Sequence, residues 1–468
     1  MRDKWWPLLA ICLGTFMLLV DVTIVGVALP SMAADLHASF TSLQWVVDGY
    51  AVALAGVLLV AGSLADRFGR RKLYAIGLAV FAVSSLCCGL APAAGTLIAA
   101  RVAQGLGAAA MFSTNTALLS VTYTGRDRGV AFGVWGAVNG AAAAIAPIFG
   151  GLLTQTFGWR SIFLVNLPIA AAALVLTWRK LAESRGHAAR TDWPGAVTIT
   201  AFAALLTFGL IRGGDHGWTS TSTLVVFAIA AASLLAFVVA ERRTATPLLD
   251  LRLLRGRSFA ALMFAALMLT ASAFAPTVYL SVWVQSVLRE DALRAGLVLA
   301  PMAIVGFVVS IAIGRHMHRV SPRWPLGIGL IFIGAGALAR TGLTASSGPS
   351  ALLAGLIITG VGAGLASPVI VSAALGAAPP ARAGMAGGAV NTFRQLGYAL
   401  GIAVLGSVLA GRIAGAAHSP AAYATGLNTI QLIAGLTGIV AGLLVLALVG
   451  HTTERPTEIR RTELAAAD

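Results

Sequence analysis

Charge is scarce in this sequence. Aspartate, glutamate, lysine and arginine together make up 10% of the 468 residues, whereas 58% of the residues are hydrophobic. A soluble globular domain carries about 25% charged residues. A chain this apolar cannot cover its surface with groups that bind water, so the composition excludes a soluble protein. It predicts an all-α polytopic membrane protein, in which each helix satisfies its own backbone groups.

Lysine and cysteine are also rare, with three of each. None of the lysines closes a Gly-x4-Gly-Lys-Ser/Thr loop, which excludes a nucleotide-hydrolysing P-loop protein. The cysteines lie inside apolar runs and lack the spacing of a disulfide framework or a metal site. We therefore expect neither a cofactor nor a metal ion.

Long hydrophobic runs fill most of the chain. The first has the length of a membrane span, so we expect a retained first span and not a cleaved signal peptide. The fourteen predicted spans are 7–30, 43–61, 73–91, 94–121, 130–152, 161–178, 194–212, 221–240, 258–284, 295–313, 325–341, 350–376, 386–411 and 427–449.

The net charge of +15 is distributed unevenly between the loops. Most lysines and arginines fall in alternate loops and in the two tails, whereas the loop 31–42 contains none. This pattern follows the positive-inside rule and predicts that both termini are cytoplasmic. It argues against a nucleic-acid binder.

A charged turn and a weaker copy of it suggest an internal repeat. The turn Gly62–Lys72 joins the second and third spans, and the stretch Gly314–Arg319 joins the tenth and eleventh. Repeated halves around a central cavity are typical of secondary transporters. The predicted organisation is a six-helix bundle at 1–190, a two-helix insert at 191–245, a six-helix bundle at 246–450 and a cytoplasmic tail at 451–468.

Few charged residues lie well inside predicted spans, where charge is costly and usually functional. Asp21, Asp48 and Arg101 have predicted depths that differ by only ~6 Å at about 1.5 Å per residue, so they could meet in one cluster. Burial and a nearby cation have opposite effects on proton binding by a carboxylate, which could therefore switch between holding and releasing a proton. The alternative is a purely structural ion pair. A fourth such residue, Arg394, stands alone in span 13.

Several motifs resemble one known family, the fourteen-span drug:proton antiporters of the major facilitator superfamily. The turn Gly62–Lys72 matches the loop motif of that superfamily at every key position. Leu19–Pro30 resembles the first-span motif of the fourteen-span group, although Gly26 replaces the usual Asn. Arg101–Ala108 resembles the fourth-span motif, and Ala146-Pro147 with its flanking glycines resembles the antiporter motif of span 5, with Ala146 where a Gly is usual.

The resemblance implies the major facilitator fold and proton-coupled export of drugs or antibiotics by alternating access, with the proton as coupling ion. It also implies a monomer that contacts lipid, protons and a small substrate. Asp21 is the first choice for the proton carrier and Asp48 the second, with Arg101 as the cation that tunes them. The loop motif is expected to stabilise the outward-open form through Gly62, Asp66, Arg67, Gly69 and Arg70. The antiporter motif comprises Gly136, Gly140, Pro147, Gly150 and Gly151. Candidate cavity residues are Trp135, Asn139, Phe274, Tyr279 and Arg394.

The sequence is compatible with more than one class of substrate. The last six spans contain no acidic residue, so selection for dications is not expected, and Arg394 would suit an anionic or neutral polar compound. One alternative is a metabolite or lipid-precursor exporter of the same fold. A remote alternative is a membrane-embedded transferase that uses His187 and Asp192, which have the spacing His-x4-Asp.

Overall fold

A computed structural model of the protein describes residues 3–185, 192–244, 247–314, 320–378, 383–413 and 419–449. Within these ranges the secondary structure is helical and contains no strand. His187, the repeated turn at 315–319 and the tail at 451–468 lie outside the described residues.

The helices follow the predicted apolar runs. Thirteen are long and apolar enough to cross a membrane, and Arg323–Leu338 is a shorter apolar helix, so the fourteen predicted spans are accounted for in the described part of the chain. The α-helices are α1 (Trp6–Leu36), α2 (Phe40–Phe68), α3 (Arg70–Gly89), α4 (Ala94–Thr122), α5 (Gly125–Phe157), α6 (Ser161–Leu164), α7 (Asn166–Lys180), α8 (Trp193–His216), α9 (Thr221–Arg243), α10 (Leu251–Arg255), α11 (Arg257–Ala273), α12 (Ala275–Ser286), α13 (Ala292–Gly314), α14 (Arg323–Leu338), α15 (Leu353–Gly376), α16 (Ala383–Ile413) and α17 (Pro420–Leu448).

Two predicted spans are divided into two helices each. The run 161–178 consists of α6 and α7, and the run 258–284 consists of α11 and α12. Pro168 and Pro276 lie just after these breaks. A proline has no N–H to donate to the carbonyl four residues earlier, and its ring clashes with that carbonyl, which interrupts the helix.

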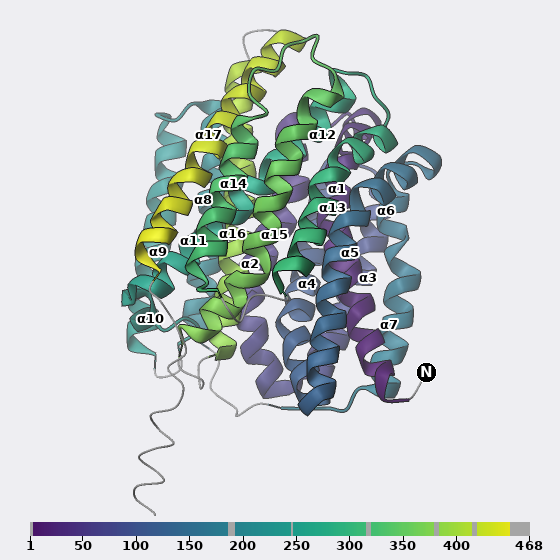
Figure 1. The fold of residues 1–468 in the computed structure, drawn as a ribbon, viewed down its shortest axis with the longest axis vertical. Coiled ribbons are helices and arrows are strands. Elements are labelled where there is room, and N and C mark those ends of the chain that lie inside the picture. The colour runs from purple at the N-terminus through teal and green to yellow at the C-terminus, as the bar shows by residue number, and fades with distance from the viewer. Residues whose placement is uncertain are drawn as a thin grey trace, which may run out of the picture.

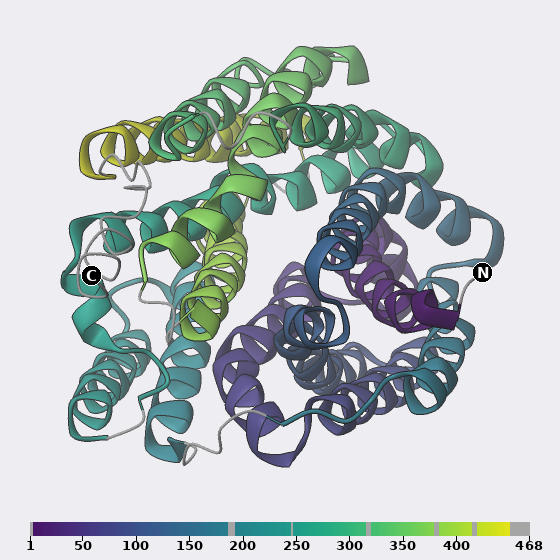
Figure 2. The same ribbon diagram turned by 60° about the horizontal axis from the view of Figure 1, so that its bottom comes forward.

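The helices form two groups with a pair beside them. Figure 2 shows α1–α7, coloured purple to blue, gathered on one side and α11–α17, green to yellow, on the other. The helices α8 and α9 pack against each other, and α8 also packs against α2 and α16. The start of α1 and the end of α17 lie at the lower end in Figure 1, which we call the termini face.

Two helix pairs form the largest contacts between the groups, and α1 adds a smaller contact with α12. The helix α2 packs along α16, and α5 packs along α13. Glycines permit the second contact, because a Cβ at Gly151 would collide with the backbone of Ala292 and Leu293, and a Cβ at Gly296 would collide with the backbone of Pro147. Small residues commonly allow such close approach between membrane helices.

We expect Gly151→Ala to loosen the α5–α13 contact, because the backbone atoms that its methyl group meets cannot turn aside. The predicted result is a thermal unfolding midpoint lowered by several degrees and slower transport. Gly136→Ala is the matched control on the same helix, because a Cβ there would meet nothing within 4 Å. Equal midpoints for the two purified variants would contradict this interpretation.

Candidate functional site

Asp21 and Arg101 form an ion pair in the interior of the first helix group. Asp21 lies on α1 and Arg101 on α4, and an Arg101 Nη1–Asp21 Oδ2 distance of 2.6 Å joins them. The two side chains are 0% and 1% exposed. The direct contact predicted from their depths in the membrane is present.

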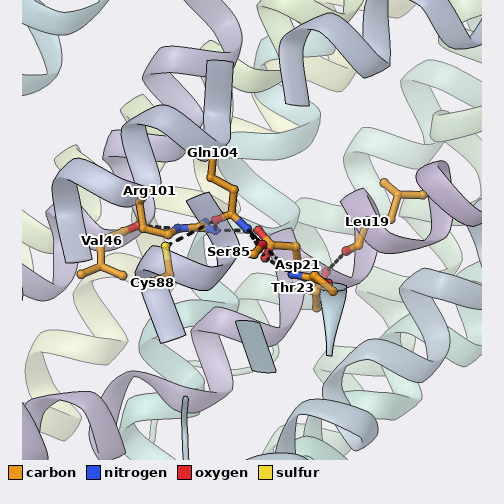
Figure 3. Close-up of polar contacts among 9 residues, drawn as sticks. Leu19, Asp21, Thr23, Val46, Ser85, Cys88, Arg101 and Gln104 are labelled. Atoms are coloured by element: carbon orange, nitrogen blue, oxygen red, sulfur yellow. Dashed lines mark hydrogen bonds and ion pairs between the residues drawn. The ribbon is translucent and has the colours of Figure 1, made fainter. Parts of the chain in front are cut away.

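Neutral side chains complete the surroundings of Asp21 (Figure 3). Gln104 Nε2 and Asn166 Nδ2 both donate to Asp21 Oδ1, at 3.0 and 3.1 Å. The same two amides donate to Ser85 Oγ. Four helices, α1, α3, α4 and α7, therefore supply this network. A carboxylate with one cation and two neutral donors is well satisfied for a buried charge.

Arg101 is held on all sides. Its Nε donates to the carbonyl oxygen of Val46 at 3.0 Å, and its Nη1 also donates to Gln104 Oε1 at 2.6 Å. The guanidinium lies 4.2 Å from the ring centre of Tyr50, which is within the range of a cation–π interaction. These contacts connect the ion pair to α2 and fix the orientation of the guanidinium.

Asp48 does not join this cluster. It is 0% exposed on α2, yet among the described residues neither carboxylate oxygen has a hydrogen-bond partner or an ion-pair partner. The expectation that three charges would meet is therefore right for Asp21 and Arg101 and wrong for Asp48. The helix α2 presents the carbonyl of Val46 to Arg101, and Asp48 is two residues further on, about 200° around the helix axis.

The loop-motif residues make their contacts within the first helix group. Asp66 accepts from Arg70 at 2.8 Å, and Gly69 has a φ of 114°, a conformation that favours glycine. Arg67 stacks on Phe68, and a Cβ at Gly62 would meet nothing within 4 Å. These contacts of Asp66 and Arg67 are local, and the predicted role of the turn in the outward-open form stays a prediction.

Glu183 is a partner of this turn that the sequence did not reveal. Its carboxylate accepts from the backbone N–H groups of Arg71 and Lys72, at 3.0 and 3.2 Å. An acidic group at the first turn of a helix satisfies N–H groups that have no partner in the helix and complements the helix dipole. Glu183 thereby fixes the start of α3 beside the segment that follows α7.

Most of the antiporter-motif residues pack closely against another helix, and one does not. Three of the glycines face other helices closely: Gly140 faces Phe307 of α13, Gly150 faces Ile24 of α1, and Gly151 faces the backbone of α13. The carbonyl of Pro147 lies against Gly296, whereas Gly136 faces open space. The described contacts therefore place most of the motif where α5 meets α1 and α13.

The candidate cavity residues have different surroundings. Trp135 Nε1 donates to Thr15 Oγ1 at 2.9 Å, and Asn139 donates to the carbonyl of Trp135. Tyr279 is 2% exposed and donates to the carbonyl of Ile402 of α16 at 2.5 Å, so it is covered in this conformation.

Two further candidates lie in the second group. Phe274 lies at the break between α11 and α12. Arg394 of α16 is half-buried, and its side chain has no ion pair or hydrogen bond among the described residues.

Sequence reasoning missed several buried polar residues. Gln104 and Asn166 were missed because they carry no charge, although their position inside apolar runs was a signal. Arg340, which falls one residue from the end of the predicted span 325–341, was also missed; it is 0% exposed and donates to Gln431 Oε1 and Thr359 Oγ1, each at 3.1 Å.

Known proteins resemble this chain over most of its length. The sequence profile of the Major Facilitator Superfamily matches residues 11–402. A methylenomycin A resistance protein of Streptomyces coelicolor is 34% identical over 95% of this chain and 92% of its own length. The multidrug resistance protein Stp of Mycobacterium tuberculosis is 36% identical over 87% of this chain and 76% of its own length. The tetracenomycin C resistance and export protein of Streptomyces glaucescens is 35% identical over 88% and 77%.

Solved structures agree on the fold. A peptide transporter POT in complex with sulfate superposes with a TM-score of 0.69, covering 95% of this chain and 94% of its own, at 15% identity. An auto-inhibited POT family peptide transporter gives a TM-score of 0.72 over 98% and 99% of the two chains, at 14% identity.

Proposed function

The chain belongs to the major facilitator superfamily, and on this premise we propose that it is a proton-coupled exporter of antibiotics or other small drugs. Relatives at about 35% identity that are named for antibiotic resistance and export support the substrate class. Its family and relatives are transporters and not enzymes. The distribution of arginine supports an inner-membrane orientation with cytoplasmic termini.

The observation that carries proton coupling is the contrast between the two buried aspartates. Asp21 has a cation and two amide donors, whereas Asp48 has none of these. A buried carboxylate without any partner is costly in its charged form, and the protonated acid is neutral. The surroundings of Asp21 therefore suit an ionised carboxylate, and those of Asp48 suit a neutral carboxylic acid. This difference supports a mechanism in which proton transfer is coupled to transport.

Alternating access would link these sites to substrate movement. The helix α2 carries Asp48 and packs along α16, so separation of the two helix groups would bring water to that carboxyl. Water favours release of a proton from a carboxyl that was buried. The half-buried Arg394 of α16 is our candidate for contacting an anionic or polar part of the substrate from the second group.

The decisive test uses everted membrane vesicles that are acidified inside and contain a fluorescent pH probe. Cationic, neutral and anionic antibiotics are added in turn to wild type and to Asp21→Asn. We expect one or more compounds to dequench the probe in the wild type, and none to do so in the variant. No dequenching by any compound, with folded protein present, would contradict drug export. If the wild type and Asp21→Asn transport a compound equally, Asp21 is not the proton carrier and Asp48 becomes the candidate.

The rivals predict different results. An exporter of an endogenous metabolite or lipid precursor would give no drug response but would give proton exchange with that compound. A transferase would form product without a proton gradient. In the structure Asp192 accepts from the N–H of Gly195 and caps α8, which is a structural role. We further propose that the protein acts as a monomer, with no cofactor other than the proton.

A further inference from the structure

A recess on the termini face lies outside the proposed transport pathway. It has a volume of about 380 Å³ and lies between the start of α11 and the end of α17. Figure 1 shows the short helix α10 close to the ends of α9 and α17 at this face. The recess is lined by Leu254, Arg255, Arg257, Phe264, Leu444 and Leu448, among others.

The floor of the recess is apolar and open to the outside of the helix bundle. Phe264, Leu444 and Leu448 are 37%, 40% and 42% exposed. Phe264 lies in the first half of α11, and Leu444 and Leu448 lie in the last two turns of α17. Exposed apolar side chains on a spanning helix contact lipid chains, so the floor suits an acyl chain.

The mouth of the recess is cationic. Arg255 and Arg257 line it, and a neighbouring recess of about 770 Å³ shares Arg255 and adds Arg242 and Arg252. These four arginines are exposed, and none forms an ion pair with another described residue. An exposed arginine at a membrane surface usually needs no partner. These four differ because they line two neighbouring recesses that share Arg255.

The acidic side chains nearby face inward. Glu241 lies in the second recess but is 5% exposed, and its Oε2 accepts from the N–H of Leu249 at 3.3 Å. Asp250 is 7% exposed and caps α10 by accepting from the N–H of Arg252 at 2.9 Å. Each of these carboxylates therefore accepts a backbone N–H, although Glu241 Oε1 has no hydrogen-bond partner among the described residues, and both are buried, whereas the four arginines are exposed.

We propose that this recess binds an anionic phospholipid, with its phosphate held by Arg255 and Arg257 and an acyl chain along Phe264, Leu444 and Leu448. Arginine is suited to this role, because its planar guanidinium can donate two parallel hydrogen bonds to a phosphate. Basic pockets between membrane helices at the cytoplasmic surface bind anionic lipid headgroups in the same way. The site would connect α9 and α10 to α11 and α17 through the lipid.

Binding is tested on the full-length protein in detergent by titration with phosphatidylglycerol, followed by native mass spectrometry. Phosphatidylcholine with the same chains tests the charge, and glycerol phosphate tests whether a free phosphate suffices. We expect saturable binding of phosphatidylglycerol, weaker binding of phosphatidylcholine and no binding of glycerol phosphate. Glycerol phosphate binding as tightly as the lipid would overturn the lipid assignment in favour of a free-anion site.

The variant R255Q/R257Q should bind phosphatidylglycerol about 30-fold more weakly, because each basic side chain near an anionic lipid contributes roughly fivefold. The matched control is R179Q/R243Q, which removes the same charge from exposed positions that line neither recess. R255K/R257K keeps the charge but loses the planar guanidinium, so its affinity should lie between those of the wild type and R255Q/R257Q. An equal loss in the control, or no loss in R255Q/R257Q, would overturn the proposal. An unchanged unfolding midpoint in detergent alone shows that the variants fold.

Discussion

We expect Asp48→Asn to fold like the wild type and to lose proton-coupled transport. The carboxyl is buried, and no described residue supplies it with a cation or a hydrogen-bond donor, which a charge at this position would need. Asparagine has nearly the same shape and is always neutral, and it therefore imitates the protonated acid permanently. The thermal unfolding midpoint should change by no more than a few degrees, because no ion pair is lost.

Transport assays separate loss of coupling from loss of binding. In everted vesicles with an imposed proton gradient, Asp48→Asn should show at least a tenfold lower rate of proton release on addition of substrate. Exchange of labelled for unlabelled substrate, which needs no net proton movement, should persist. Asp127→Asn is the control, because Asp127 pairs with Lys4 at the surface and such exposed pairs contribute about 0–1 kcal/mol. Wild-type proton release by Asp48→Asn would remove Asp48 from the mechanism.

The sequence was sufficient to predict the helical architecture. Long apolar runs can cross a membrane only as helices or closed barrels, and the runs here are too long and continuous for barrel strands. The breaks after α6 and after α11 were missed, although Pro168 and Pro276 were visible. A proline in a membrane helix can bend it or divide it, and the neighbouring helices decide which.

The ion pair was predictable because depth could be calculated from position along a helix. Asp21 and Arg101 have similar predicted depths, and they meet. Depth does not give the direction of a side chain around the axis, and each residue along a helix turns that direction by about 100°. This is why Asp48 was placed with the pair but lies apart from it.

The neutral members of the network were harder to predict. Gln104, Asn166 and Ser85 become significant only when α3, α4 and α7 bring them to Asp21. No periodicity in the sequence specifies that convergence, because each residue is a single polar group in an apolar helix. The same holds for Glu183, whose partners are backbone N–H groups at the start of another helix.

Arg101→Ala should be the most destabilising single change in the first helix group. It would leave the Asp21 carboxylate 0% exposed with only two amide donors, and removing one partner of a buried ion pair costs about 3–5 kcal/mol. The yield of monodisperse protein and its unfolding midpoint should both fall sharply. Arg101→Lys should be intermediate, because lysine keeps the charge but loses the planar geometry that contacts Val46 and Tyr50.

The double variant D21N/R101Q distinguishes a structural ion pair from a coupling one. Removing both charges leaves neutral groups that can hydrogen-bond to each other, so folding should recover to near the wild-type midpoint. Transport should not recover, because neither the carboxyl group at position 21 nor the cation at position 101 remains to take part in the proton cycle. If the double variant folds and exports antibiotics with proton exchange, the pair is structural and the coupling function passes to Asp48. If Arg101→Ala is as stable as the wild type, Asp21 is not ionised in this conformation and the charge assignment of the network is wrong.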